Sequence, residues 1–232
     1  MGSMIDFVRP DGQPRRGYLA GASNPQAPAM VVLQEWWGLN NQIRGVADRF
    51  ARAGYHALVP DLYGGKATVE AEEAHHLMEG LNFADAASQD IRGAVQVLKA
   101  RGAPAVGVTG FCMGGALTVL SLCLVPEVDA GVIWYGMPPL EYVDAKQIKA
   151  PVLAHWALQD AFFPIAGVDA LEEKLRVAAV TYQGHRYPAN HAFANETARG
   201  ATQLLPETIY DESASQAAWD RTFRFLGSAL RS

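Results

Sequence analysis

One cysteine in this sequence lies where a nucleophile of covalent catalysis would be expected. Cys112 stands in the turn GFCMG, with Gly110 and Gly114 two residues to either side. This spacing is that of the G-x-nucleophile-x-G elbow, whose nucleophile occupies a strained turn between a strand and a helix. The glycines let neighbouring backbone approach without a clash at Cβ. The pattern predicts a catalytic thiol rather than a buried structural cysteine.

A thiol nucleophile works best with a base that is itself oriented by an acid, and in folds with this elbow both follow the nucleophile in chain order. Asp160, just beyond the apolar run PVLAHWA, is the predicted acid, whereas Asp169 is expected within the next helix. His191 in PANHAF is the predicted base, because it follows the last expected strand by about eight residues. His185 follows that strand too closely to fold back over the sheet edge.

The remaining cysteine and histidines have structural interpretations. Cys123 lies in an apolar helical stretch and is expected to pack in the core. If both cysteines belong to one helix they are roughly 16 Å apart, so the thiols are expected to be free. His155 falls inside a strand and is interpreted as a packed, hydrogen-bonded residue. The histidines lack the paired spacing of a zinc site, and no motif indicates a nucleotide or flavin, so we expect neither metal nor cofactor.

The elements that position these residues alternate along the chain. Apolar runs at 29–34, 55–63, 105–111, 130–136, 151–157 and 179–184 are expected to be strands. Helices are expected at 40–54, 69–81, 85–101, 115–125, 167–177 and 213–230, and a hairpin at 5–21 around a Pro-Asp-Gly turn. Such alternation predicts an α/β fold with a mostly parallel sheet and helices on both faces. We expect a single domain over residues 4–232, with residues 1–3 a cloning remnant.

Composition excludes several classes of function. Half of the 232 residues are hydrophobic, and the net charge is -5 without a basic run, so we expect a folded domain that does not bind nucleic acid. The sequence contains neither a long apolar segment nor the blocks of a signal peptide. We therefore expect a soluble cytoplasmic protein with no membrane partner, and a monomer.

The end of the run at 29–34 carries a second polar feature. Glu35 is followed by two tryptophans in VVLQEWWG, at the level where the oxyanion-hole loop of such folds begins. The backbone N–H groups of Trp36 and Met113 are the predicted oxyanion donors. A carboxylate close to a thiol opposes formation of the thiolate. From the residues alone, Glu35 is either an exposed strand-end glutamate or a functional group.

Together, the motifs QEWWG, GFCMGG, LQD and NHAF resemble those of the dienelactone hydrolase (carboxymethylenebutenolidase) family. The resemblance covers nearly the whole chain and implies the α/β-hydrolase fold. It also implies a triad of Cys112, Asp160 and His191. Glu35 would then hold the resting thiol neutral and take its proton when substrate displaces it.

The sequence also departs from the family pattern. The family has a serine directly after the histidine and an arginine a few residues on, where this chain has Ala192 and Asn195. A second family arginine precedes the elbow, where only His75 and His76 stand. Dienelactone itself is therefore a doubtful substrate, unless a residue such as Arg186 supplies the charge.

The connection between 136 and 151 is too short for a cap domain, so we expect an open cleft. Aromatic side chains near strand ends are expected to line it and to bind substrate: Trp37, Tyr63, Tyr135, Phe162 and Phe193, with Trp36 beside them.

The sequence thus predicts a hydrolase of small lactones or carboxylic esters that works by acyl transfer through a thioester. Two alternatives stay open. One is a thiol amidase or acyltransferase that uses the same triad. The other is a non-catalytic, redox-sensing or ligand-binding protein in which Cys112 is oxidised.

Overall fold

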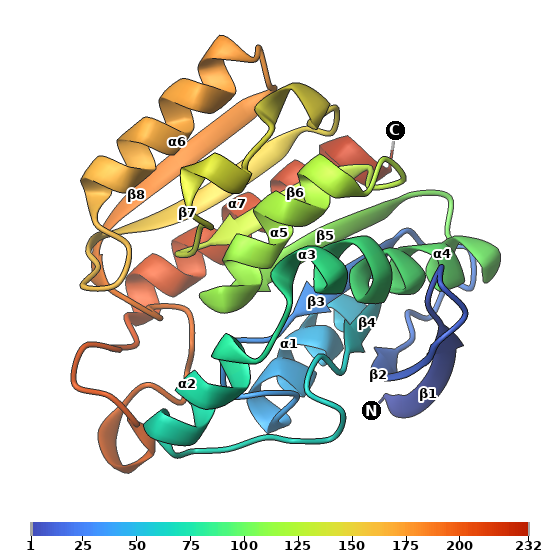
Figure 1. The fold of residues 1–232 in the computed structure, drawn as a ribbon, viewed down its shortest axis with the longest axis horizontal. Helices are drawn as coiled ribbons and strands as arrows, with labels where there is room; N and C mark the ends of the chain where they lie inside the picture. Colours follow the sequence, from blue (N-terminus) through green and yellow to red (C-terminus); the bar gives the residue numbers. More distant parts are fainter. Residues whose placement is uncertain (1, 232) are drawn as a thin grey trace.

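The computed structural model describes residues 2–231, and its centre is one eight-stranded sheet (Figure 1). The strand order is β1-β2-β4-β3-β5-β6-β7-β8, with β1, β2 and β4 paired antiparallel and every later pairing parallel. The strands are β1 Ser3–Val8, β2 Pro14–Ala20, β3 Ala29–Leu33, β4 His56–Pro60, β5 Val106–Phe111, β6 Ala130–Trp134, β7 Val152–Gln159 and β8 Tyr182–Asn190. The predicted mostly parallel sheet is confirmed.

Helices cover both faces of this sheet. They are α1 Asn41–Arg52, α2 Ala71–Glu79, α3 Phe83–Asp85, the π-helical turn η1 Ala86–Ile91, α4 Arg92–Ala100, α5 Met113–Leu124, α6 Ile165–Val177 and α7 Glu212–Leu230. One core cluster joins the sheet to α4, α5 and α6, and a second joins the opposite face to α1 and α7. In Figure 1, α4 and α5 accordingly lie in front of the sheet, with α1 and α7 behind it.

Strand β3 shows why both faces are covered. All of its side chains are buried, and they alternate between the two clusters, with Val31 in one and Val32 in the other. A strand that is apolar on both sides needs a helical layer on each. Helix α1 meets this need with an apolar stripe that includes Ile43 and Phe50, and it begins where the Asn40 side chain accepts a hydrogen bond from the Ile43 N–H at 3.1 Å.

Strand β8 differs from the sequence expectation. It does not end near Gly184 but continues to Asn190, through Pro188. β8 is an edge strand, and a proline there need not interrupt a ladder. His185 consequently lies within the strand, and His191 follows it directly rather than after about eight residues.

The chain between β6 and β7 contains only two short 3-10 turns, Leu140–Tyr142 and Ala145–Gln147, and no cap, as expected. Three further residues lie in η4, the 3-10 turn Gly200–Thr202. No helix within residues 2–231 has both the length and the apolar character needed to cross a membrane.

At the N-terminus, the residues interpreted as a cloning remnant are partly structured. Met1 lies outside the described residues, whereas Ser3 begins β1 and the N–H of Gly2 donates to the Tyr18 hydroxyl at 2.8 Å.

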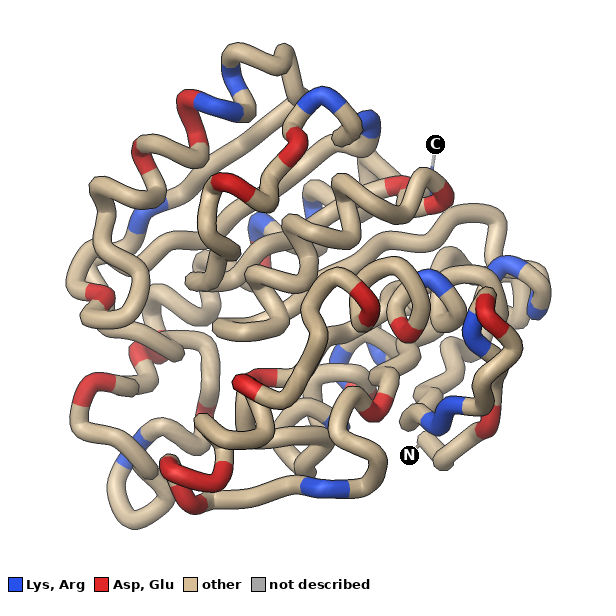
Figure 2. Tube along the Cα trace, viewed as in Figure 1, with Lys and Arg blue, Asp and Glu red and all other residues tan. Residues whose placement is uncertain are grey.

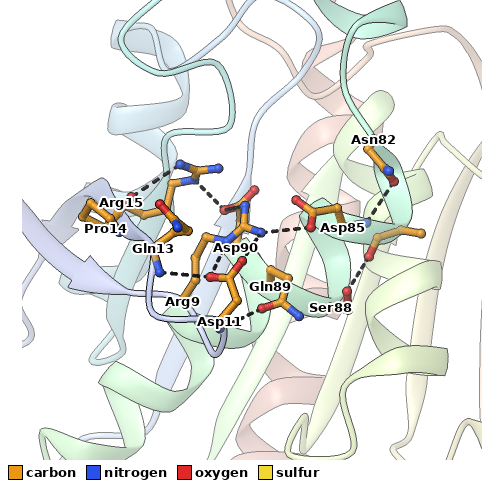
Figure 3. Close-up of polar contacts among 11 residues, drawn as sticks. Arg9, Asp11, Gln13, Pro14, Arg15, Asn82, Asp85, Ser88, Gln89 and Asp90 are labelled. Carbon is orange, nitrogen blue, oxygen red and sulfur yellow. Dashed lines mark hydrogen bonds and ion pairs between the residues drawn. The ribbon is translucent and has the colours of Figure 1, made fainter.

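A network of charges fastens the N-terminal hairpin to the helical layer (Figure 3). The Arg9 guanidinium is 7% exposed and contacts Asp11 at 2.8 Å, Asp85 at 2.9 Å and Asp90 at 3.2 Å. Arg15 also contacts Asp90, at 2.6 Å. Asp90 is 4% exposed, and its burial raises its pKa even though both arginines lower it. Arg9 is therefore the residue through which the hairpin, η1 and α3 are joined.

Replacing Arg9 should destabilise the protein. In Arg9→Met, buried Asp90 loses one of its two cationic partners, and we expect the free energy of unfolding to fall by about 2 to 3 kcal/mol. Urea unfolding measures this loss. The matched control is Arg16→Met, because Arg16 and Asp6 form a 3.5 Å pair with exposed fractions of 66% and 83%. Such pairs contribute little. Equal losses in the two variants would contradict the role of Arg9.

Candidate active site

The residues with predicted chemistry gather at one edge of the sheet, where the parallel strands have their carboxyl ends. Glu35 lies just past β3, Cys112 follows β5, Asp160 follows β7 and His191 follows β8. Ligands of open α/β sheets bind at this edge. Chain segments far apart in sequence are brought to the same place by the parallel pairing of their strands.

The backbone at Cys112 has the sharp turn that the elbow pattern predicts. Its φ is 54° and its ψ is -116°, and it precedes the first residue of α5. Positive φ is uncommon for residues other than glycine and marks strain. The flanking glycines are required sterically, because a Cβ at Gly110 would collide with the backbone of Gly114, and one at Gly114 would lie 2.5 Å from the Leu33 carbonyl oxygen. The turn holds Cys112 at the end of the strand, where its side chain lines a cavity.

Asp160 and His191 are in direct contact. The Nδ1 atom of His191 lies 2.7 Å from Oδ2 of Asp160, and both side chains are almost fully buried. The other carboxylate oxygen of Asp160 accepts the backbone N–H groups of Phe162 at 2.8 Å and Phe163 at 2.9 Å. The carboxylate is thus held by its own loop while it orients the imidazole.

The thiol lies on the other side of His191. Burial alone lowers the pKa of His191, but the charge of Cys112 and hydrogen bonds to Asp160 and Cys112 raise it to about 10. Aromatic rings enclose the imidazole, with centroids of Tyr135 at 5.1 Å and Phe162 at 4.9 Å. A proton on His191 is therefore stabilised from two sides, which suits a group that gives a proton to a leaving alcohol.

The competing residues lie elsewhere. Asp169 is on the exposed side of α6 and pairs with Arg186 at 2.6 Å. His155 is fully buried, with one ring nitrogen 3.0 Å from the Tyr187 hydroxyl and the other 2.9 Å from that of Thr222, which confirms its structural interpretation. Both cysteines are free, as expected, and burial raises the pKa of Cys123 to about 11.

Glu35 is not an exposed strand-end glutamate. Its side chain is buried, lines the same cavity as Cys112, and accepts a hydrogen bond from the Asn195 amide at 2.8 Å through Oε2. Oε1 has no hydrogen-bond partner within residues 2–231. Burial raises the pKa of Glu35, although the His191 charge, the Asn195 amide and the nearby Tyr135 hydroxyl lower it in part. The carboxyl group therefore favours its protonated form more than an exposed glutamate does.

Two backbone N–H groups beside Cys112 are unoccupied. Neither Trp36 nor Met113 donates its N–H to a backbone acceptor within residues 2–231. Both follow strand ends at this edge of the sheet, and that of Met113 belongs to the first turn of α5, where the helix dipole is positive. These are the features that an oxyanion site needs.

A cavity of about 140 Å³ opens beside Cys112. Of the aromatic side chains expected to line it, Trp36, Trp37 and Phe162 do so. Tyr135 and Phe193 are fully buried in the core cluster behind the site, and Tyr63 instead places its hydroxyl 3.2 Å from the Met113 sulfur. The expectation that these three line the cleft is corrected, because strand-end position alone does not determine which way a ring points.

Several lining residues were not anticipated. They are Asn40, Met78, Phe163, Ala192, Asn195, Thr197, Ala198, Thr202, Leu204, Leu205 and Thr208. Most belong to the polar segment 195–211, which has no periodicity to signal its position. Ala192 and Asn195 lie in or beside the NHAF motif and are noted in the sequence only as departures from the family pattern, and the bond of Asn195 to Glu35 required the folded chain.

No group of three His, Cys, Asp or Glu residues within the described chain is arranged to hold a metal ion. The polar groups that face the cavity are the predicted acyl-transfer set and a few hydroxyl and amide side chains.

A mostly parallel sheet with a strained cysteine elbow, and an imidazole and a carboxylate on later loops, defines an α/β-hydrolase. The sequence profile of the Dienelactone hydrolase family matches residues 15–230, and the chain belongs to this family.

Individual relatives agree over their full lengths. "Protein usf" of Aquifex pyrophilus is 33% identical, with 99% of this chain and 100% of the relative covered. A relative from Aquifex aeolicus, provisionally named carboxymethylenebutenolidase, is 30% identical, with 100% of each chain covered. The crystal structure of a provisionally assigned dienelactone hydrolase from Klebsiella pneumoniae superposes with a TM-score of 0.81 at 25% identity, covering 98% of this chain and 99% of that one.

Proposed function

We propose that this hydrolase cleaves small lactones or carboxylic esters by acyl transfer through a thioester on Cys112. The observation that carries the proposal is the 2.7 Å contact between Asp160 and His191, with the His191 ring beside a cysteine in a strained elbow at the cavity wall. The family relationship supports a hydrolase, and the geometry supports this choice of nucleophile.

In the proposed cycle the thiol proton of Cys112 passes to Glu35 as substrate enters. The sulfur then attacks the substrate carbonyl carbon while the N–H groups of Trp36 and Met113 stabilise the oxyanion. The bond to the alcohol oxygen breaks, and His191 gives its proton to that oxygen. Water then attacks the thioester and passes a proton to His191. The acid leaves as the sulfur is released, and the sulfur regains its proton from Glu35. Asp160 keeps Nδ1 of His191 protonated throughout.

The test compares small esters and lactones with amides of the same acyl group, in parallel with a peroxide titration of the thiol. We expect turnover of esters and lactones, with a transient acyl adduct on Cys112 in acid-quenched samples analysed by mass spectrometry. Comparable turnover of amides would favour a thiol amidase. Ready oxidation of Cys112 without any hydrolysis would favour a redox sensor.

We further propose that Glu35 holds the resting thiol neutral and takes its proton when substrate enters. This role requires a carboxylate that is basic enough to accept the thiol proton, and the raised pKa of buried Glu35 supports it. The Asn195 amide fixes Oε2 of the carboxyl group, which leaves Oε1 free to carry and exchange the proton.

Glu35→Gln should make the protein less sensitive to rising pH. A raised pKa means that the folded state binds more protons than the unfolded state above the ordinary glutamate pKa of 4.5. Stability from this group is present below pH 4.5 and is lost as pH rises towards the folded pKa. In that window, wild type should lose up to about 1.4 kcal/mol per pH unit relative to the variant.

Urea unfolding across pH 4 to 8 measures this difference, and a pH profile of kcat/KM for the same two proteins tests the role in activity. We expect a lower or displaced profile for Glu35→Gln. Parallel stability curves would show that folding does not raise the pKa of Glu35. An unchanged activity profile would reject the proton-handling role.

A further inference from the structure

One part of the cavity wall is built from apolar side chains. Met78 comes from α2, whereas Leu204 and Leu205 come from the segment 195–211, and all three line the cavity. In Figure 1 this orange-red segment lies beside α2. Segment 195–211 is attached to the site, because the N–H of Ile209 donates to the His191 carbonyl at 3.1 Å and that of Asp211 to the Phe193 carbonyl at 3.0 Å. The wall formed by Met78, Leu204 and Leu205 is therefore held in place next to the predicted base.

The same cavity offers no cation to a substrate carboxylate. Within residues 2–231, no lysine or arginine lines it, and the only ionisable lining groups are Glu35, Cys112 and His191. The imidazole of His191 already has a carboxylate at 2.7 Å and the thiol beside it. A carboxylate placed against the apolar wall would lose its water without gaining a partner, which is unfavourable.

Three basic residues of the neighbouring segments are directed elsewhere. Arg186, which could have supplied a charge, contacts Asp169 and Glu172 at 2.6 Å each and does not line the cavity. Arg199, within segment 195–211, has its guanidinium 5.1 Å from the ring centroid of Tyr210. His75 on α2 is exposed and lies 3.2 Å from Glu79.

Charges around the cavity also disfavour an anion. Helix α2 and the residue before it carry Glu70, Glu72, Glu73 and Glu79 without a lysine or arginine. Figure 2 shows red positions along α2 in the lower part of the molecule, with blue positions on neighbouring segments. The negative charge of α2 disfavours the approach of an anionic ligand.

We infer that the site selects uncharged esters, whose hydrocarbon acyl chain lies along the wall formed by Met78, Leu204 and Leu205, and discriminates against acyl groups that carry a carboxylate. This inference rests on the proposed esterase function and specifies its substrate class.

The test uses two nitrophenyl esters with the same leaving group and acyl chains of equal length, the hexanoate and the adipate monoester. Spontaneous hydrolysis, measured in the presence of Cys112→Ala, is subtracted for each. We expect kcat/KM to be about 100-fold higher for the hexanoate. Equal or faster turnover of the adipate monoester would overturn this inference and leave the esterase function intact. No turnover of either ester would reject the esterase function and the inference with it.

A pair of matched variants locates the acyl chain. Leu204 lines the cavity and is 43% exposed, whereas Ile209 is on the same segment, is 42% exposed and does not line it. Leu204→Arg should reduce the preference for the hexanoate about tenfold by supplying a cation, and Ile209→Arg should leave the ratio unchanged. An unchanged ratio in Leu204→Arg, or equal changes in both variants, would overturn the placement of the chain along this wall.

Discussion

Cys112→Ala should lower kcat/KM for ester hydrolysis by at least about 10,000-fold while the protein remains folded. Removal of the nucleophile leaves only binding and oxyanion stabilisation, and losses of this size or larger follow in enzymes that form acyl intermediates. Stability should change little, because alanine and cysteine share the Cβ that makes the φ of 54° unfavourable. Initial rates and a thermal melt on the same samples measure both effects.

Cys123→Ala is the matched control for this variant. Cys123 is also a free thiol, but it lies within α5 and burial raises its pKa to about 11. The control variant should retain the activity of wild type. Substantial turnover by Cys112→Ala, with a normal melt, would exclude the thioester route.

Asp160→Asn should lower kcat by about 1,000- to 10,000-fold with a small effect on KM. The asparagine oxygen can still accept the N–H groups of Phe162 and Phe163, which directs its amide nitrogen towards Nδ1 of His191. The imidazole then carries its proton on the ring nitrogen that should accept the proton of the attacking water. Loss of the carboxylate also removes one of the contributions that raise the pKa of His191.

Steady-state kinetics measures the loss, and titration of His191 by NMR detects the lower pKa. Asp169→Asn serves as the control, because Asp169 is an aspartate 56% exposed on α6 that pairs with Arg186. It should leave both measurements unchanged. A kcat for Asp160→Asn within tenfold of wild type would show that another group orients the imidazole.

Local pattern was sufficient for much of the fold. The apolar runs and amphipathic stretches predict the order of strands and helices, because an element buried on one or both faces has a periodic or continuous pattern of hydrophobic residues. The elbow is equally local, since the glycine at 110 and the glycine at 114 are demanded by backbone contacts within a few residues. Asp160 directly follows β7, close to where the apolar run ends.

Non-local features were predicted less well. The extension of β8 through Pro188 depends on its place at the edge of the sheet. The local sequence of β8 does not indicate that place. Tyr135 has a φ of 36°, and its ring packs against Phe111, His191 and Phe193, which come from other segments of the chain. The π-helical turn η1 lies within a stretch that reads as ordinary helix, and it carries Asp90 towards the charges of the hairpin.

The sequence by itself determined the class of fold, the strained turn at Cys112 and the choice of Asp160 and His191 as partners, because each depends on short-range sterics or on chain order in a parallel sheet. Only the tertiary structure decided that Glu35 is buried against Asn195, and that the cavity wall is apolar and without a lysine or arginine within residues 2–231. The burial and the charge of a site depend on contributions from several segments that are distant in sequence. They exist only once those segments have packed together.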